Sequence, residues 1–200
     1  METSNRQSQI HWLIPVLASL LLLAACNGRD TSTNSPPPVI SSPPRGTTYP
    51  MPPTRTQTLT QMGWEFPDGK RTIFSEFQGK ALILDFYATW CVPCRDSVPH
   101  LIELQKKYES QGLQVVGLNV GGSDDELQVP AFRKEFGIQY PLAKPDDDLV
   151  GFLLSDSDAI PQTFVFNRQG QLVQRFVGYG PETGKYLDSA VETALKSPTP

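Results

Sequence analysis

Two kinds of hydrophobic pattern alternate along the chain from about residue 59 onward. Short apolar-rich runs predict the strands of a largely buried sheet. These runs cover residues 81–87, 114–120, 162–166 and 171–177. Apolar residues three or four positions apart follow Cys91 and Pro181, and they predict two amphipathic helices. Strands that alternate with helices in this way predict an α/β domain.

Shorter elements are expected between these main ones. The stretch Pro67–Lys70 is a turn signal near the start of the domain. Ser123–Glu126 is typical of a capping box, in which the first side chain caps a helix. Pro130–Phe136 predicts a second helical segment closed by Gly137. Leu149–Leu154 predicts one or two further helical turns.

The first 56 residues differ in composition from the rest. Residues 1–25 are interpreted as a signal peptide, because Arg6 precedes an apolar run, Trp12–Ala25, that is shorter than the ~18–20 residues needed to span a bilayer. Residues 26–56 are rich in proline, serine and threonine, which predicts a disordered and partly stiff tether. The globular domain is therefore expected at residues 57–197.

Charge and histidine content limit the function classes. The formal net charge is −4 and no basic patch stands out, so nucleic acid is not an expected partner. His100 is the only histidine after the signal peptide, and we expect it on a helix surface. Two thiols and one imidazole fall short of a four-ligand zinc site, so no metal is expected. The apolar stripe of the last helix is assigned to the core, and no cofactor is expected.

Cys91 and Cys94 form a C-x-x-C motif between the first apolar run and the helix that follows. The first thiol is therefore expected to be exposed at a helix N-terminus, where free backbone N–H groups and the helix dipole favour a thiolate. A thiolate is the nucleophile in disulfide exchange. The second thiol lies close enough to form a disulfide with the first, so the pair can be oxidised and reduced repeatedly.

Two blocks of the sequence resemble the thioredoxin superfamily, and within it the TlpA/ResA-like, membrane-attached thiol-disulfide oxidoreductases. The first block is Asp85–Cys94, with Pro99 further along the helix, and the second is Ala159–Phe166, which looks like the family's cis-proline segment. The similarity extends from about Thr60 to about Leu195. It implies a thioredoxin-like α/β fold: a central mixed β-sheet flanked by helices, with an N-terminal β-hairpin and an insert at about 121–158.

The resemblance also implies a role for an acid behind the redox pair. Asp85 stands six residues before Cys91, where thioredoxins carry a buried acid, and it would pass protons to and from Cys94 with a pKa raised by desolvation. Some TlpA/ResA-like proteins instead carry a glutamate at the position of Ser97. The alternative is that Asp85 faces the surface or pairs with a lysine.

Substrate contacts follow from the same resemblance. Pro161 would pack against the Cys91–Cys94 disulfide, and the backbone of Ile160 would pair with the substrate chain as an added strand. The resemblance places further substrate contacts at Trp90, Val92 and Pro93. The alternative for Pro161 is an ordinary trans proline at a strand start.

The end of the signal peptide resembles a bacterial lipobox. By this resemblance the stretch Leu23–Cys26 is cleaved before Cys26, and the Cys26 sulfur then carries a lipid. The lipid would anchor the domain to a membrane of the cell envelope on the extracytoplasmic (periplasmic) side. An uncleaved anchor, or a secretory signal with an incidental cysteine, is the alternative.

The resemblance implies reduction of disulfides in exported proteins, for example apocytochrome c, with a membrane thiol donor of the DsbD/CcdA type. Val92 and Pro93 offer the thiolate neither charge nor a side-chain donor. We therefore expect a reduction potential nearer to that of thioredoxin, about −270 mV, than to that of DsbA, about −120 mV.

Two other functions remain as alternatives. Peroxiredoxin-type thiol peroxidases share the fold, but their Pro-x-x-x-Thr-x-x-Cys motif is missing because Leu84 and Ala88 occupy the required positions. A tethered copper chaperone could hold Cu(I) on Cys91 and Cys94, since thiolates favour that ion. Sco-like copper proteins, however, use wider cysteine spacing and a distant histidine.

Overall fold

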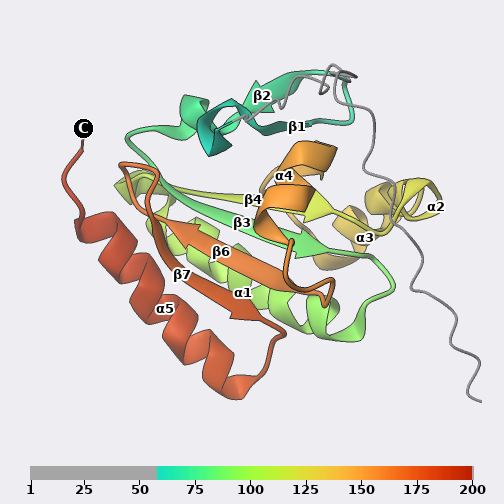
Figure 1. The fold of residues 1–200 in the computed structure, drawn as a ribbon. Helices are drawn as coiled ribbons and strands as arrows, with labels where there is room; N and C mark the ends of the chain where they lie inside the picture. The colour runs from blue at the N-terminus through green and yellow to red at the C-terminus, as the bar shows by residue number, and fades with distance from the viewer. Residues whose placement is uncertain (1–57, 200) are drawn as a thin grey trace, which may run out of the picture. The chain divides into compact units, whose positions relative to one another are not determined.

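The computed structural model describes residues 58–199, and a seven-stranded mixed sheet forms their centre (Figure 1). The order of the strands is β2-β1-β5-β4-β3-β6-β7. The central strands β3, β4 and β5 are parallel, whereas β6, β7, β1 and β2 join by antiparallel pairing. The strands are β1 (Gly63–Glu65), β2 (Arg71–Ile73), β3 (Ala81–Tyr87), β4 (Leu113–Asn119), β5 (Leu142–Pro145), β6 (Gln162–Phe166) and β7 (Leu172–Val177).

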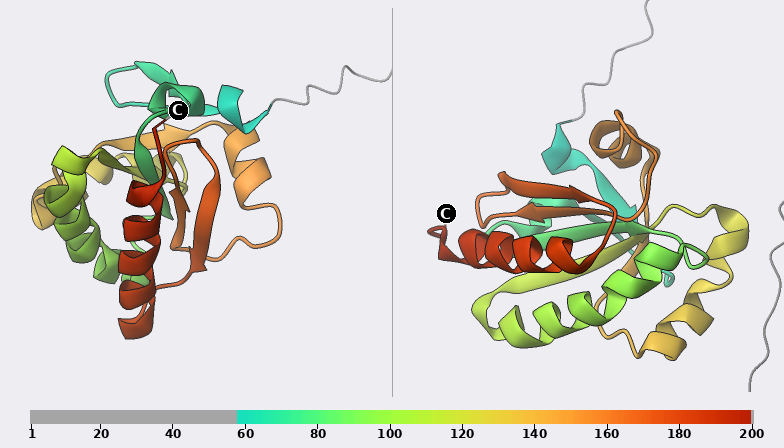
Figure 2. Two further views of the ribbon diagram at one scale, coloured as in Figure 1. Left: turned by 90° about the vertical axis from the view of Figure 1, so that its left-hand side faces the viewer. Right: turned by 90° about the horizontal axis from the view of Figure 1, so that it is seen from below.

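Helices cover both faces of this sheet (Figure 2). One face carries α1, α3 and α5, and the other carries α4 together with the segment before β3. The helices are α1 (Val92–Tyr108), α2 (Ser123–Glu126), α3 (Val129–Phe136), α4 (Asp147–Leu153) and α5 (Pro181–Lys196). This arrangement confirms the thioredoxin-like α/β fold. Among residues 58–199, no helix combines the length and the hydrophobicity that a membrane span requires.

The central strand β3 explains how the sheet separates two cores. All seven of its residues are buried, and side chains alternate between faces along a strand. Leu82, Leu84 and Phe86 pack toward α4, whereas Ile83 and Tyr87 pack toward α1 and α5. The position between Ile83 and Tyr87 on the second face belongs to Asp85, so a carboxyl group faces the side of the sheet that carries α1.

The N-terminal hairpin extends the sheet beyond β5. Strands β1 and β2 pair antiparallel around the turn predicted at Pro67–Lys70, where Gly69 takes a φ of 80°. Trp64 of β1 pairs with Pro145 of β5 and is fully buried. Burial of this indole against Phe77 fixes the hairpin on the sheet.

The segment between β4 and β6 contains α2, α3, β5 and α4. The predicted capping box at Ser123 is wrong: Gly122 is the N-cap of α2, with a φ of 88°, and no side chain caps the helix. Glycine reaches this backbone conformation at no steric cost, so the helix starts one residue earlier than a serine cap would allow. Helix α3 begins at Val129 and ends at Phe136, and Gly137 follows as the predicted C-cap with a φ of 66°.

Candidate active site

The C-x-x-C motif lies where β3 leads into α1, and its two sulfurs are bonded. The Cys91–Cys94 disulfide has an S–S distance of 2.06 Å and a Cα–Cα distance of 5.2 Å. Cys91 is the N-cap of α1, and its Sγ accepts a hydrogen bond of 3.3 Å from the backbone N–H of Cys94. The same donor and the positive end of the helix dipole would stabilise a thiolate at Cys91 once the bond is reduced.

The two sulfurs differ less in exposure than the sequence suggested. Cys94 is fully buried, and Cys91, predicted to be exposed, retains only 5% of its accessible surface. Trp90 and Val92, the residues directly before and after Cys91, are 67% and 68% exposed. Pro93, also exposed, occupies the first turn of α1. An incoming disulfide therefore meets an apolar surface around a largely covered sulfur.

The second sequence block meets the disulfide in space. The Ile160–Pro161 peptide bond is cis, and strand β6 begins directly after it. The carbonyl oxygen of Ile160 lies 3.7 Å from Cys91 Sγ, although the two residues are 69 positions apart. The backbone polar groups of Ile160 thus lie beside Cys91 Sγ. A substrate chain that pairs with a backbone edge by strand addition needs such groups next to the reactive sulfur.

Asp85 is buried in the sheet on the face that carries α1. Its Oδ1 accepts a hydrogen bond of 2.7 Å from the hydroxyl of Thr163, its antiparallel partner on β6. Burial raises the pKa of Asp85 to about 7, and the Thr163 hydrogen bond only partly offsets that rise. No lysine pairs with Asp85 among residues 58–199. A carboxyl group with this pKa can accept and return a proton near neutral pH.

Two other polar residues of α1 have structural contacts. Ser97 is buried, and its hydroxyl donates to the carbonyl of Cys94 at 2.8 Å. His100, expected on the surface of α1, is partly covered there: its Nε2 lies 3.0 Å from Asp188 Oδ1 and its Nδ1 lies 3.2 Å from the Tyr179 hydroxyl. The side chain keeps only 16% of its accessible surface, since α5 packs over this part of α1.

Sequence reasoning missed a hydrogen-bonded group that holds Thr89, two residues before Cys91. Asp125 of α2 is buried, and its carboxylate accepts a 2.9 Å hydrogen bond from the backbone N–H of Thr89 and another from the Thr89 hydroxyl. The side-chain amide of Asn119 donates to the same carboxylate at 2.6 Å. Burial raises the pKa of Asp125, but the hydrogen bonds from Thr89 and Asn119 outweigh burial and lower it.

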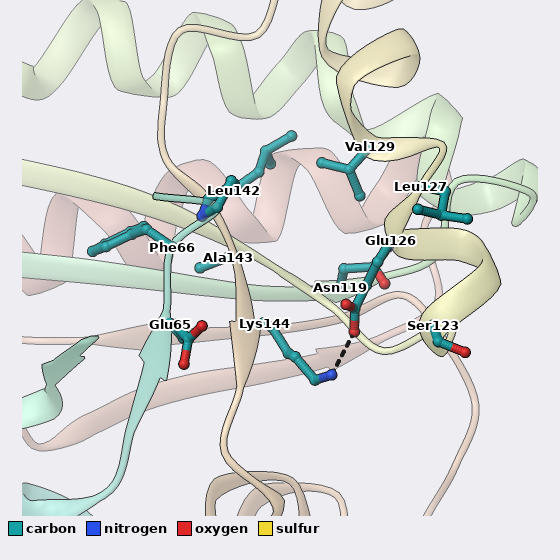
Figure 3. A pocket seen from close by; sticks show the side chains of 11 residues that line it. Glu65, Phe66, Asn119, Ser123, Glu126, Leu127, Val129, Leu142, Ala143 and Lys144 are labelled. Carbon is teal, nitrogen blue, oxygen red and sulfur yellow. Dashed lines mark ion pairs between the residues drawn. The ribbon is translucent and has the colours of Figure 1, made fainter. Parts of the chain in front are cut away.

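A cavity of about 340 Å³ lies beside this group, between the hairpin, β5 and α2 (Figure 3). Phe66, Leu142 and Val129 form apolar parts of its lining. Glu126 and Lys144 form an ion pair of 2.7 Å at its rim. Neither cysteine of the disulfide lines the cavity, so it is separate from the exchange site.

Some predicted residues cannot be placed in this site. Cys26, the signal peptide and the tether lie outside the described residues. Within residues 58–199, no group of three or more His, Cys, Asp or Glu side chains is arranged to hold a metal ion.

The fold and the disulfide at the start of α1 define a thioredoxin-superfamily domain with a redox-active cysteine pair. The chain belongs to the Redoxin family, whose profile matches residues 65–195. Taken together, the family, the fold and the bonded pair make this a thiol-disulfide oxidoreductase domain of the TlpA/ResA-like type.

Named relatives agree with this assignment. The chain is 34% identical over 114 residues to the thiol-disulfide oxidoreductase ResA of Bacillus subtilis, which covers 57% of this chain and 62% of that protein. It is 32% identical over 129 residues to ResA of Geobacillus kaustophilus, covering 61% of this chain and 72% of that protein. Among solved structures, a thioredoxin-family thiol:disulfide interchange protein from Chlorobium tepidum is 31% identical, with a TM-score of 0.58, covering 69% of this chain and 96% of that one.

Proposed function

We propose that this protein is an exported, membrane-tethered oxidoreductase that reduces disulfides of other exported proteins. The observation that carries the proposal is the position of Cys91 Sγ. This sulfur accepts a hydrogen bond from the N–H of Cys94 and also lies beside the carbonyl oxygen of Ile160. The first contact favours a thiolate, and the second provides a backbone edge on which a substrate chain can bind.

The reaction begins with the reduced pair. The Cys91 thiolate attacks one sulfur of the client disulfide, so a Cys91–client bond forms while the client S–S bond breaks. The second client sulfur leaves as a thiolate and takes a proton from solvent. Trp90 and Val92, both well exposed, supply the apolar contacts that hold the client chain during this step.

The second step releases the client. Cys94 gives its proton to the Asp85 carboxylate, and the new Cys94 thiolate attacks Cys91 Sγ. The Cys91–Cys94 bond forms, the Cys91–client bond breaks, and the client sulfur that was bonded to Cys91 leaves as a thiolate. A pKa of about 7 suits Asp85 to this exchange, because the carboxylate and the acid are then both populated at neutral pH.

The net direction of disulfide exchange depends on how strongly the Cys91 thiolate is stabilised. Apart from the start of α1, few groups stabilise it. Val92 and Pro93 bring no charge and no side-chain donor to Cys91, so we assign the protein a reducing role with a potential nearer to about −270 mV than to about −120 mV. The oxidised pair must then be reduced again, and a membrane thiol donor of the DsbD/CcdA type would supply the electrons. Apocytochrome c haem-site cysteines are one class of client that needs such a reductant.

The tether part of the proposal rests on the sequence alone. Lipid on Cys26 would hold the domain at a membrane through the proline-rich residues 26–56. Cys26→Ala should move the protein from the membrane fraction to the soluble extracytoplasmic fraction. Retention of the variant in the membrane fraction would contradict a lipid anchor at this residue.

A trapping experiment tests the exchange function. Cys94→Ser removes the resolving thiol, so client proteins should remain bonded to Cys91 and should be released by dithiothreitol. Cys91→Ser is the matched control, and it should trap far less because Cys94 is fully buried. If Cys94→Ser traps no protein while the wild type copurifies with copper, the copper-chaperone alternative would replace the proposal. Rapid consumption of hydroperoxide by the wild type would favour the peroxidase.

A further inference from the structure

The loop that delivers Cys91 to the start of α1 is a tight turn. The backbone N–H of Cys91 donates to the carbonyl of Ala88 at 3.2 Å, so Thr89 and Trp90 form the two central residues of that turn. The position of Thr89 therefore sets both the direction of the exposed Trp90 side chain and the placement of Cys91 as helix cap.

Every polar group of Thr89 has a partner from outside the turn. Its N–H and hydroxyl donate to Asp125, and its carbonyl accepts a 3.2 Å hydrogen bond from Arg95. Arg95 is in turn held by α3, through an ion pair with Glu135 and a guanidinium–ring contact of 4.9 Å with Phe136. We call Asp125, Asn119 and Arg95 the Thr89 clamp.

Helix α2 is attached to the rest of the domain through the Asp125 carboxylate. Asp125 is the only buried residue of its four, and Leu127 directly after the helix is 76% exposed. The cavity of Figure 3 lies next to α2, with Ser123 and Glu126 in its lining, so little apolar packing holds this helix from that side. A buried carboxylate with three donors is the main attachment between α2 and the rest of the domain.

The neighbouring glycine fits the same interpretation. A Cβ atom built on Gly121 would lie 2.3 Å from Asp125 Oδ2 and 2.5 Å from its Cγ, so the carboxylate occupies the space of the missing side chain. The Gly121 N–H also donates to Asn119 Oδ1 at 3.2 Å, which orients the amide toward Asp125. Alanine at this position would push the carboxylate away without removing its charge.

We propose that Asp125 is a positioning residue for disulfide exchange, which acts by holding Thr89 and through it Trp90 and Cys91. The inference rests on the exchange reaction at Cys91 and adds to it a role for α2. Asp125 need not touch the substrate or the sulfurs. It fixes the turn, and a fixed turn keeps Cys91 Sγ where the Cys94 N–H and an incoming disulfide can both reach it.

Three variants separate positioning from charge. Asp125→Asn removes the charge and half of the acceptor oxygens, Gly121→Ala displaces the carboxylate but keeps its charge, and Thr89→Val removes only the hydroxyl donor. Asp124→Asn is the matched control, because Asp124 is the exposed acid next to Asp125 and its side chain forms no hydrogen bond or ion pair in the described structure. Reaction with a protein disulfide, the pH dependence of Cys91 alkylation and thermal melting are measured for each.

Positioning predicts one pattern of results. Asp125→Asn and Gly121→Ala should each slow exchange by about tenfold, since a displacement of about 1 Å at a reacting group can cost up to a hundredfold. Both should raise the pKa of the Cys91 thiol, and Thr89→Val should show the same trend more weakly. Asp124→Asn should match the wild type.

Other results would overturn the inference. If Asp125 acts only through its charge, Asp125→Asn lowers the pKa of Cys91 and Gly121→Ala leaves it unchanged. If Asp125 serves stability alone, the variants melt earlier while exchange by the folded protein stays within about twofold of the wild type. Thr89→Val is the mildest change and keeps the test available should the other variants not fold. A wild type without exchange activity would remove the proposed function itself, whereas an active wild type with equally active variants would remove only the clamp.

Discussion

The hydroxyl of Thr163 on β6 donates a 2.7 Å hydrogen bond to the buried carboxyl of Asp85 on β3. Thr163 stands two residues after Pro161, so the strand that directly follows Ile160 and Pro161 also contacts the acid proposed to serve Cys94. Strand β6 therefore links the backbone proposed to bind substrate, at Ile160, to the proposed proton acceptor, Asp85. The roles of both residues can be tested.

Asp85→Asn should stabilise the oxidised protein more at pH 8 than at pH 4. The pKa of Asp85 rises from 3.8 to about 7 on folding, so both states are protonated only well below pH 3.8, where burial carries no charge penalty. As the pH rises toward 7 the unfolded chain ionises first, and stability falls. One pKa unit is equivalent to about 1.4 kcal/mol, so the loss reaches at most about 4 kcal/mol above pH 7. Denaturant melts across this range measure it, and a gain independent of pH would contradict a buried, titrating Asp85.

The same variant should also slow release of the client. Asparagine cannot accept the Cys94 proton, so the second step should lose the pH dependence centred near 7 and become limited by deprotonation to solvent. Resolution of a mixed disulfide formed with a labelled peptide, followed from pH 5 to 9, measures this step. Unchanged resolution in Asp85→Asn would assign the proton transfer to another group.

Thr163→Val should raise the pKa of Asp85 above its present value. The hydroxyl hydrogen bond favours the carboxylate and lowers that pKa, and valine keeps the shape while removing the donor. Thr163→Ser is the control that retains a hydroxyl. The carboxyl carbon shift of Asp85 in an NMR titration reports the change. A midpoint in Thr163→Val equal to or below that of the wild type would show that the hydroxyl does not stabilise the charge.

Trp90→Ala should weaken reaction with proteins more than with small disulfides. The indole is 67% exposed beside Cys91, so its loss should cost little stability but should remove apolar contact with a client chain. We expect kcat/KM for a protein disulfide to fall by about tenfold, or about 1.4 kcal/mol. Tyr186→Ala is the control, since that ring on α5 is 63% exposed. Equal losses in both variants, or an equal loss with a small disulfide, would exclude a client contact at Trp90.

Pro93→His should make the pair more oxidising. An imidazolium in the first turn of α1 would stabilise the Cys91 thiolate, and about 1.4 kcal/mol of such stabilisation raises the potential of this two-electron couple by about 30 mV. Equilibration with glutathione buffers gives both potentials. A wild-type value above about −180 mV would contradict the reducing role, and an unchanged value in the variant would contradict the reason given for it.

The sequence predicted the parts of this fold that depend on local pattern. The buried strand at 81–87 has a continuous apolar run, and the Trp-Cys-Val-Pro-Cys stretch marks the strand-to-helix junction. The cis geometry at Pro161 followed from the resemblance of its flanking residues to a known segment. The strand and the junction depend only on neighbouring residues, so the sequence pattern reveals them, whereas the cis bond was implied by the resemblance alone.

The clamp could not be predicted in the same way. Asp125 stands in the acidic run Asp124–Glu126, which on its own is typical of a solvated helix start. It becomes buried because its donors come from Thr89, 36 residues earlier, and from the end of β4. The small exposure of Cys91 was missed for a related reason, since Ile160, far along the chain, approaches the sulfur. Contacts of this kind appear only when strands meet.

The hydrogen bonds between Asp125 and Thr89 limit how far this domain can be truncated. A minimal version that joins the end of β4 directly to β5 would lose both α2 and α3, and with them the acceptor for the Thr89 amide and hydroxyl and the anchor of Arg95. Those groups would need water or a redesigned acceptor, because buried donors left unpaired cost about 1–3 kcal/mol each. A trimmed scaffold should therefore keep a carboxylate at this spot even if it discards everything around it.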